Sequence, residues 1–268
     1  MMGTNFFVVG AAKSGTTAFY HGLRRHPDVF LPAVKEPHVY AYLADPSVAR
    51  HLFADEAAAR RRYQELYQEV RDEKAVGDAS TTNLVVHGAA EVIASEVPAA
   101  RIVAVLRHPV DRAYSHWRHF RAAGGEDIAD FAEALRQEEP RAAAGVPVTY
   151  QYLGWGRYCG QLRPYFESFG RERVLVHLYD DWCSDAEAVL RATFGFLGVD
   201  DSLPMAPLGR FNEMPAAPPR GLRGRLRDRR RAAPPTLDPV LRAELTATFH
   251  DEIDGLEELI GRDLSDWR

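Results

Sequence analysis

Cysteine is scarce in this chain. Only Cys159 and Cys183 occur among 268 residues, which is too few for a disulfide framework. Neither lies in a CxxC or Cys/His cluster of the kind that binds zinc. We expect both to be reduced thiols in or near the core, as in most cytosolic proteins. The sequence therefore predicts a cytoplasmic protein without a metal site.

Long apolar runs and an excess of positive charge are also missing. The apolar stretch 6–12 ends at Lys13, far short of the roughly 20 residues that span a membrane, and no basic segment of a signal peptide precedes it. A net charge of −5 gives no general attraction to nucleic acid or anionic lipid. We expect neither partner, and the sequence indicates no particular oligomeric state.

Short apolar runs are present, and helical patterns lie between them. Continuous apolar strands that alternate with amphipathic helices are typical of a parallel sheet covered on both faces, a three-layer α/β/α domain. No repeat or linker divides the chain, so we expect one domain over 1–268. The predicted strands are Asn5–Gly10, Ala75–Asp78, Arg101–Leu106 and Arg173–Leu178, and the predicted helices include Thr17–Arg25, Asp111–Ala122 and Ala186–Leu197.

Three stretches interrupt this pattern. Segments 41–74 and 124–156 have few strand signals, and such insertions normally cover the carboxyl ends of the strands, where ligands bind. We expect them to form an acceptor site. Segment 204–235 is predicted to be a long loop. Within it, RGLRGRLRDRRR (220–231) holds seven arginines and one aspartate, so it is either a solvated surface loop or a lid over a ligand.

The segment GAAKSGTT (10–17) follows the first predicted strand directly. A strand–turn–helix corner places backbone N–H groups and a helix N-terminus at one point, which suits a phosphate group. A structural turn with an incidental lysine is the alternative. The residues predicted to bind phosphate are Lys13, Ser14, Gly15, Thr16 and Thr17.

The same segment differs from an ATP-binding loop. In GxxxxGK[ST] the lysine follows the second glycine and the next hydroxyl binds magnesium. Here Lys13 precedes Gly15, and Thr16 follows it. The sequence therefore predicts phosphate binding without an essential metal ion.

A second motif, RIVAVLRHPVDRAYSHW (101–117), reads as a strand that ends before Arg107 and a helix that starts near Pro109. Proline is favoured at the first helical position. Arg107 and Ser115 could converge on a second phosphate. Alternatively, the arginine forms a surface ion pair and the serine faces solvent.

Together, GAAKSGTTAFYHGLRRHPDV and VLRHPVDRAYSHW resemble the two donor motifs of sulfotransferases that use 3′-phosphoadenosine 5′-phosphosulfate (PAPS). KEPHVY, GDASTTN, GWGRYCGQL and LEELIGRDLSDW are similar to segments of bacterial members and of the heparan sulfate N- and 3-O-sulfotransferases. The resemblance covers most of the chain. It implies a fold like that of P-loop NTPases and transfer of a sulfuryl group.

The resemblance also implies roles for individual residues. Lys13 would neutralise the 5′-phosphate and bridging oxygen, and 14–17 would cradle them. Arg107 and Ser115 would hold the 3′-phosphate. Tyr158 and an arginine of the basic loop, for which Arg230 is the choice, are also assigned to donor binding.

A base must remove the acceptor's proton. The heparan sulfate branch has a glutamate in a segment like KEPHVY, which points to Glu36. Histidine is the base in cytosolic small-molecule sulfotransferases, so His38 is the rival or an assistant. Glu36 could instead be a surface carboxylate paired with Lys35 or Arg25. The family's usual lysine is replaced by Ala79, which puts a polysaccharide contact in doubt.

The sequence thus predicts PAPS-dependent transfer to a hydroxyl, rather than an amine, of a small molecule, natural product or carbohydrate. An ATP-dependent kinase of the same layered fold, which would need magnesium, is one alternative. A non-catalytic nucleotide-binding protein is the other.

Overall fold

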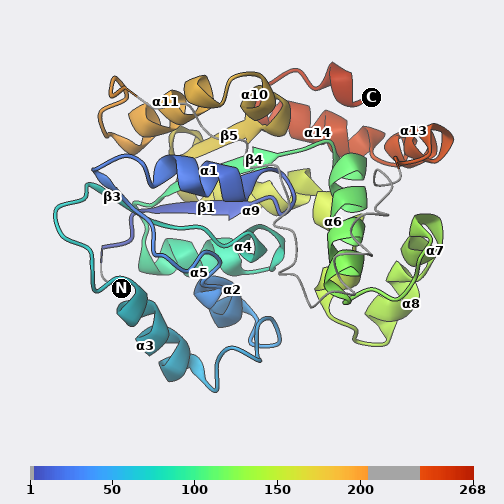
Figure 1. Cartoon of the computed structure of the whole chain (residues 1–268), viewed down its shortest axis with the longest axis horizontal. Helices are drawn as coiled ribbons and strands as arrows, with labels where there is room; N and C mark the ends of the chain where they lie inside the picture. The colour runs from blue at the N-terminus through green and yellow to red at the C-terminus, as the bar shows by residue number, and fades with distance from the viewer. Residues whose placement is uncertain (1–2, 205–235) are drawn as a thin grey trace, which may run out of the picture.

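A parallel sheet forms the centre of the molecule (Figure 1). The computed structural model describes residues 3–204 and 236–268. Within them the strand order is β2–β3–β1–β4–β5, and every pairing is parallel. The strands are β1 (Phe6–Gly10), β2 (Val29–Phe30), β3 (Ala75–Asp78), β4 (Arg101–Leu106) and β5 (Val174–Leu178). The four predicted strands are confirmed; the two-residue edge strand β2 was missed.

Alternate side chains of β1 enter two different cores. Phe6 and Val8 are fully buried against helices α1 (Thr16–Leu23) and α11 (Ala186–Leu197). Phe7 and Val9 are buried on the other face, against α2 (Val39–Ala44), α5 (Ala89–Glu96) and α9 (Tyr158–Phe169). Strand side chains point to opposite faces in turn, so each face of the sheet is covered by helices. The predicted three-layer α/β/α architecture is confirmed (Figure 1).

The helices connect successive strands. The predicted helices Thr17–Arg25, Asp111–Ala122 and Ala186–Leu197 are confirmed as α1, α6 and α11, with small shifts at two of them. The full set comprises α1 (Thr16–Leu23), α2 (Val39–Ala44), α3 (Glu56–Leu66), α4 (Thr82–Val85), α5 (Ala89–Glu96), α6 (Pro109–Ala123), α7 (Phe131–Arg136), α8 (Glu138–Ala143), α9 (Tyr158–Phe169), α10 (Tyr179–Ser184), α11 (Ala186–Leu197), α13 (Pro239–Ala247) and α14 (His250–Ile260), with the short 3-10 helices η1 (Val148–Tyr150), η2 (Gly154–Gly156), η3 (Arg171–Arg173) and η4 (Ser265–Trp267).

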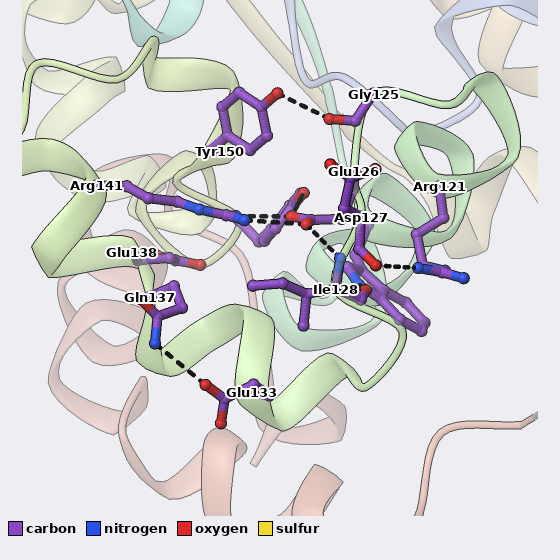
Figure 2. A network of polar contacts seen from close by, with 12 residues as sticks. Arg121, Gly125, Glu126, Asp127, Ile128, Glu133, Gln137, Glu138, Arg141 and Tyr150 are labelled. Atoms are coloured by element: carbon purple, nitrogen blue, oxygen red, sulfur yellow. Dashed lines mark hydrogen bonds and ion pairs between the residues drawn. The ribbon is translucent and has the colours of Figure 1, made fainter.

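Segment 124–156 is held together by one buried carboxylate (Figure 2). Both Glu126 oxygens accept hydrogen bonds from Arg141, at 2.6 and 2.9 Å, and Tyr152 Oη donates at 2.7 Å. The backbone N–H of Ile128 donates at 2.8 Å. Burial opposes the charge, but these four donors prevail and lower the pKa of Glu126 to about 2. The segment is thus built around a fully satisfied ion.

Segment 41–74 occupies a different place from 124–156. Its helix α3 packs through Tyr63 and Tyr67 against the start of β1 and the middle of β3. The hydroxyls of Tyr63 and Thr4 are 3.0 Å apart, and Tyr67 Oη donates to the Gly77 carbonyl. Thr4 precedes β1, so α3 lies near the amino ends of the strands. These contacts do not favour an acceptor-binding role for α3, and that role stays a prediction.

Two further expectations concern the cysteines and the chain's surroundings. Cys159 is buried and free, but Cys183 is exposed, so the prediction that both lie in or near the core is wrong for Cys183. It lies on the short helix α10, where its side chain contacts that of Tyr179. No described helix is long and apolar enough to cross a membrane. Cytoplasmic location remains a prediction.

Candidate functional site

The loop after β1 forms the centre of the site. The Ala11 N–H donates to the Val105 carbonyl at 2.8 Å, which fastens the loop to β4. Lys13 and Gly15 both have left-handed backbone angles, with φ of 70° and 81°. A Cβ at Gly15 would lie 2.9 Å from the Tyr179 ring, so only glycine fits. The turn ends at the first residue of α1, where N–H groups without helical partners favour an anion.

The hydroxyl groups of this loop have different surroundings. Thr17 is exposed, whereas Thr16 is only 5% exposed and Ser14 is completely buried. The Ser14 side chain lies beneath the loop beside Tyr158. Among the three side chains, Thr17 is therefore the one that faces outward. The Ser14 N–H donates within the loop, to the Ala11 carbonyl at 3.2 Å.

Four cations gather around this loop. Burial lowers the pKa of Lys13, and the positive charges of Arg107, Lys35 and Arg118 lower it further. In residues 3–204 and 236–268, no carboxylate pairs with Lys13, Arg107 or Arg118. Like charges held together at the start of a helix form a site for a polyanion.

Aromatic rings hold Arg107 in place. Its guanidinium lies 4.9 Å from the centre of the Tyr179 ring, and its Nη1 donates to the Lys13 carbonyl at 3.4 Å. The Tyr158 hydroxyl donates to the Arg107 carbonyl at 2.9 Å. Burial raises the pKa of Tyr158 to about 12, so this hydroxyl keeps its proton. Tyr158 thus fixes the backbone from which Arg107 extends.

Ser115 lies two turns along α6 from Arg107 and is half-buried. The helix begins at Pro109, as predicted, after the buried residue His108. His108 Nε2 lies 3.1 Å from the carbonyl oxygen of Trp267, which ties the carboxyl-terminal segment to the start of α6. No hydrogen bond joins Ser115 to Arg107 in the described part of the chain, so a ligand would have to bridge them.

Glu36 is held over the end of β3. Its φ is 62°, and its N–H donates to the Ala79 carbonyl at 3.1 Å. Its Oε2 accepts a hydrogen bond from the Thr81 N–H at 2.6 Å, and its Oε1 accepts one from the Thr81 hydroxyl at 3.1 Å. The Glu36 carboxylate also forms an ion pair with Lys35. The side chain is 22% exposed, so Glu36 is a fixed carboxylate that solvent and ligands can reach.

His38 lies next to Glu36, and it also has a left-handed φ, 60°. Its N–H donates to Ser80 Oγ at 3.0 Å, and its Nδ1 lies 2.9 Å from Thr82 Oγ1. Burial lowers the pKa of His38, although the charge of Glu36 acts in the opposite direction. At neutral pH the imidazole is therefore uncharged, with one nitrogen already engaged.

Sequence reasoning missed three charged residues of the site. Lys35 was considered only as a partner of Glu36, yet its charge also reaches Lys13, so it joins the two clusters. Arg118 lies three residues after Ser115 on α6, and that helical spacing could have indicated a shared face. Asp78 ends β3 with no exposed surface; burial first, and then the charge of Glu36, raise its pKa to about 7.

Two other expectations concern the basic loop and a metal site. Arg230 and the basic run 220–231 fall outside the described residues. Where the chain is described, no three His, Cys, Asp or Glu side chains gather as metal ligands. The cations around Lys13 can bind a polyanion next to the Glu36 carboxylate, which Thr81 holds in position.

Several known proteins are similar to this chain. Human carbohydrate sulfotransferase 15 is 26% identical over 248 residues, covering 73% of this chain and 44% of that protein. The mouse protein of the same name is 25% identical with the same coverage. The chain thus spans less than half the length of these curated relatives.

Solved structures agree with the layered fold. The crystal structure of a sulfotransferase from Alicyclobacillus acidocaldarius superimposes with a TM-score of 0.82, at 33% identity over 100% of both chains. The sulfotransferase domain of the curacin biosynthetic pathway gives 0.52 at 16% identity, covering 77% of this chain and 76% of that one; this second likeness concerns the fold alone. The profile of the sulfotransferase family matches residues 5–202, and the chain therefore belongs to the sulfotransferase family.

Proposed function

We propose that this protein transfers a sulfuryl group from PAPS to a hydroxyl of a small molecule, natural product or carbohydrate. The observation that carries the proposal is the cluster of Lys13, Arg107 and Arg118, cations without described carboxylate partners, beside Glu36. PAPS carries two separate phosphate groups. The loop 13–17 suits the 5′-phosphosulfate, and Arg107 with Ser115 suits the 3′-phosphate.

In the proposed reaction Glu36 accepts the proton of the acceptor hydroxyl. The acceptor oxygen then bonds to sulfur while the bond from sulfur to the 5′-phosphate oxygen breaks. Lys13 and the N–H groups at the start of α1 stabilise the negative charge that develops on that oxygen. The donor supplies the sulfuryl group, and the chain supplies position, charge and a proton acceptor.

Glu36 suits the role of base better than His38. Its carboxylate is held by Thr81, paired with Lys35 and partly accessible. The His38 imidazole has Nδ1 engaged with Thr82, so we assign it to positioning the site or assisting Glu36. The Lys35 ammonium, which pairs with Glu36, can move towards the donor as the carboxylate takes up its proton.

The acceptor class rests on two kinds of support. The first is that a curated relative is named a carbohydrate sulfotransferase; the second is the residue at position 79. Ala79 replaces a lysine that heparan sulfate enzymes carry, and this favours a small acceptor over a sulfated polymer.

The direct test is to incubate the protein with PAPS and a panel of phenols, alcohols, amines and sugars. Formation of 3′,5′-phosphoadenosine (PAP) with a matching gain of a sulfuryl group in one acceptor supports the proposal. Thermal shift separates the kinase alternative, because a kinase is stabilised by ATP with magnesium rather than by PAP. A nucleotide-binding protein without activity would bind PAP and transfer nothing to any acceptor.

A further inference from the structure

A pocket of about 130 Å³ lies between the first turn of helix α5, with the segment 84–88 before it, and residues 160–165 of helix α9. Both helices run from the carboxyl edge of the sheet back towards its amino edge, since β4 and β5 follow them. The Tyr158 bond to Arg107 confirms that α9 starts at the carboxyl edge. Leu84, which lines the pocket, packs against Gly10 at the carboxyl end of β1, so this wall of the pocket lies at the same edge of the sheet as the loop that holds Lys13.

The walls of the pocket are mostly apolar, and its rim is polar. Leu84, Val86, Ala90, Pro164 and Tyr165 supply apolar surface. His87 and Glu91 are exposed at the rim. An engineered apolar cavity of about 150 Å³ holds benzene, so this pocket is of the size of one ring.

Two features of α9 shape the pocket wall. Gly160 has no side chain, and a Cβ added there would meet nothing within 4 Å. Pro164, four residues later, has no N–H and cannot donate the helical hydrogen bond to the Gly160 carbonyl. Both residues line the pocket. The helix thus offers open space and a backbone oxygen released from its usual partner.

Helix α4 connects this pocket with the proposed base. Thr81, just before the helix, binds Glu36, and Thr82 at its start contacts His38. Leu84 and Val86, at its other end, line the pocket. One helical turn rises about 5.4 Å, so the two places are separated by little more than one turn of helix.

We propose that the pocket binds the non-reacting end of the acceptor, an apolar group of about one ring that carries an O–H or N–H donor. The donor bonds to the Gly160 carbonyl while the reacting hydroxyl lies at Glu36. The acceptor role rests on the proposed function, but binding of such a ring does not.

The test compares phenol with anisole, which has the same ring and no donor, by ligand-observed NMR titration. Wild type should bind phenol about 3- to 10-fold more tightly than anisole, the effect of one hydrogen bond. Gly160→Leu fills the open space and should weaken phenol binding at least tenfold. Gly160→Ala is the matched control and should keep at least half of the wild-type affinity.

A second variant tests the carbonyl. Pro164→Ala restores the N–H that satisfies Gly160, so the preference for phenol over anisole should fall to about one. Unchanged phenol binding in Gly160→Leu, or a retained preference in Pro164→Ala, overturns the proposal. The absence of saturable phenol binding to wild type does so as well.

PAP affinity measured on the same samples keeps the two proposals apart. It should stay within twofold of wild type in all three variants. Loss of PAP binding by wild type, with phenol binding intact, would overturn the donor assignment alone. With an aryl-alkyl alcohol as acceptor, Gly160→Leu should raise KM at least tenfold and leave kcat nearly unchanged; an equal KM would refute the acceptor role.

Discussion

The loop around Lys13 and the segment around Glu126 differ in whether their charged groups are paired. Arg141 is paired with Glu126 through two hydrogen bonds, and Tyr152 and Ile128 complete the shell. Lys13 is surrounded by other cations, and no described carboxylate pairs with it. The first arrangement stabilises a segment of the fold. The second costs stability until an anion binds, which is the expected property of a binding site.

Removing Lys13 should have the largest effect on activity. We expect Lys13→Ala to lower kcat/KM about 10³-fold or more, since one lost donor to the developing charge costs about 10²–10³ and donor affinity falls as well. Because the change relieves repulsion with Arg107, the melting temperature without ligand should not fall. Steady-state kinetics and thermal melts measure both.

A matched control for Lys13 is Arg136→Ala, since Arg136 is an exposed cation paired with Glu133 on α7. Its activity and stability should be nearly those of wild type, because surface pairs contribute about 0–1 kcal/mol. If Lys13→Ala were as mild as this control, the comparison between the two regions would fail.

Glu36→Gln should lower kcat about 10²- to 10⁴-fold, the usual contribution of a general base. The amide keeps the shape of the side chain, so PAP affinity should stay within a few-fold of wild type by calorimetry. Glu65→Gln, at an exposed carboxylate paired with Arg62, is the control. Full turnover in Glu36→Gln would transfer the role of base to another group, with His38 next to be tested.

Glu126→Gln should destabilise the protein rather than act on the donor. Breaking a buried ion pair costs about 3–5 kcal/mol, and we expect about 2–3 kcal/mol because Arg141 is partly exposed. The pKa of Glu126 is lowered to about 2 in the fold. Its stabilisation is therefore present above about pH 4.5 and is lost as pH falls towards 2.

Urea unfolding at several pH values measures this effect. The difference in the free energy of unfolding between wild type and Glu126→Gln should decrease steadily below pH 4.5. PAP affinity at pH 7 should be unchanged. A difference in the free energy of unfolding that does not depend on pH would show that packing, rather than charge, stabilises the segment.

Asp78→Asn should change stability with the opposite sign and leave the donor site untouched. Burial raises the pKa of Asp78 to about 7, so the folded protein binds its proton more tightly than the unfolded chain. Stability is then lost between about pH 4 and pH 7 as the carboxyl ionises. The gain in the free energy of unfolding of the variant over wild type should be about 3 kcal/mol larger at pH 8 than at pH 4.5, since one pKa unit corresponds to about 1.36 kcal/mol. An equal gain at both pH values would contradict this.

Contiguous patterns were predictable from the sequence. The apolar runs placed β1, β3, β4 and β5 within one residue, and GAAKSGTT placed the loop at the carboxyl end of β1. The edge strand β2 was missed because two residues make no apolar run. The position of α3 was not predictable because periodicity does not say which end of the sheet a helix covers.

Residues brought together by the fold were harder to predict. Arg118 and Lys35 approach Lys13 only because α6 and the segment before α2 meet at one edge of the sheet. Asp78 was predicted only as the last residue of a strand, and the sequence does not show its complete burial near Tyr40, Tyr63 and Tyr67. Ser14 was expected to offer its hydroxyl to phosphate, which stays a prediction, and the sequence did not indicate that its side chain is completely buried.

The left-handed backbone at Lys13, Glu36 and His38 has a consequence for mutational tolerance. Glycine or asparagine is easier to accommodate in that region than most other residues. In a scan scored for folded abundance alone, glycine at these positions should equal or exceed the native residue. Scored for activity, the same substitutions should be among the least tolerated. A position where glycine scores well for abundance and poorly for activity holds a residue that lowers stability and is needed for function. Such a scan would locate the active site without any ligand.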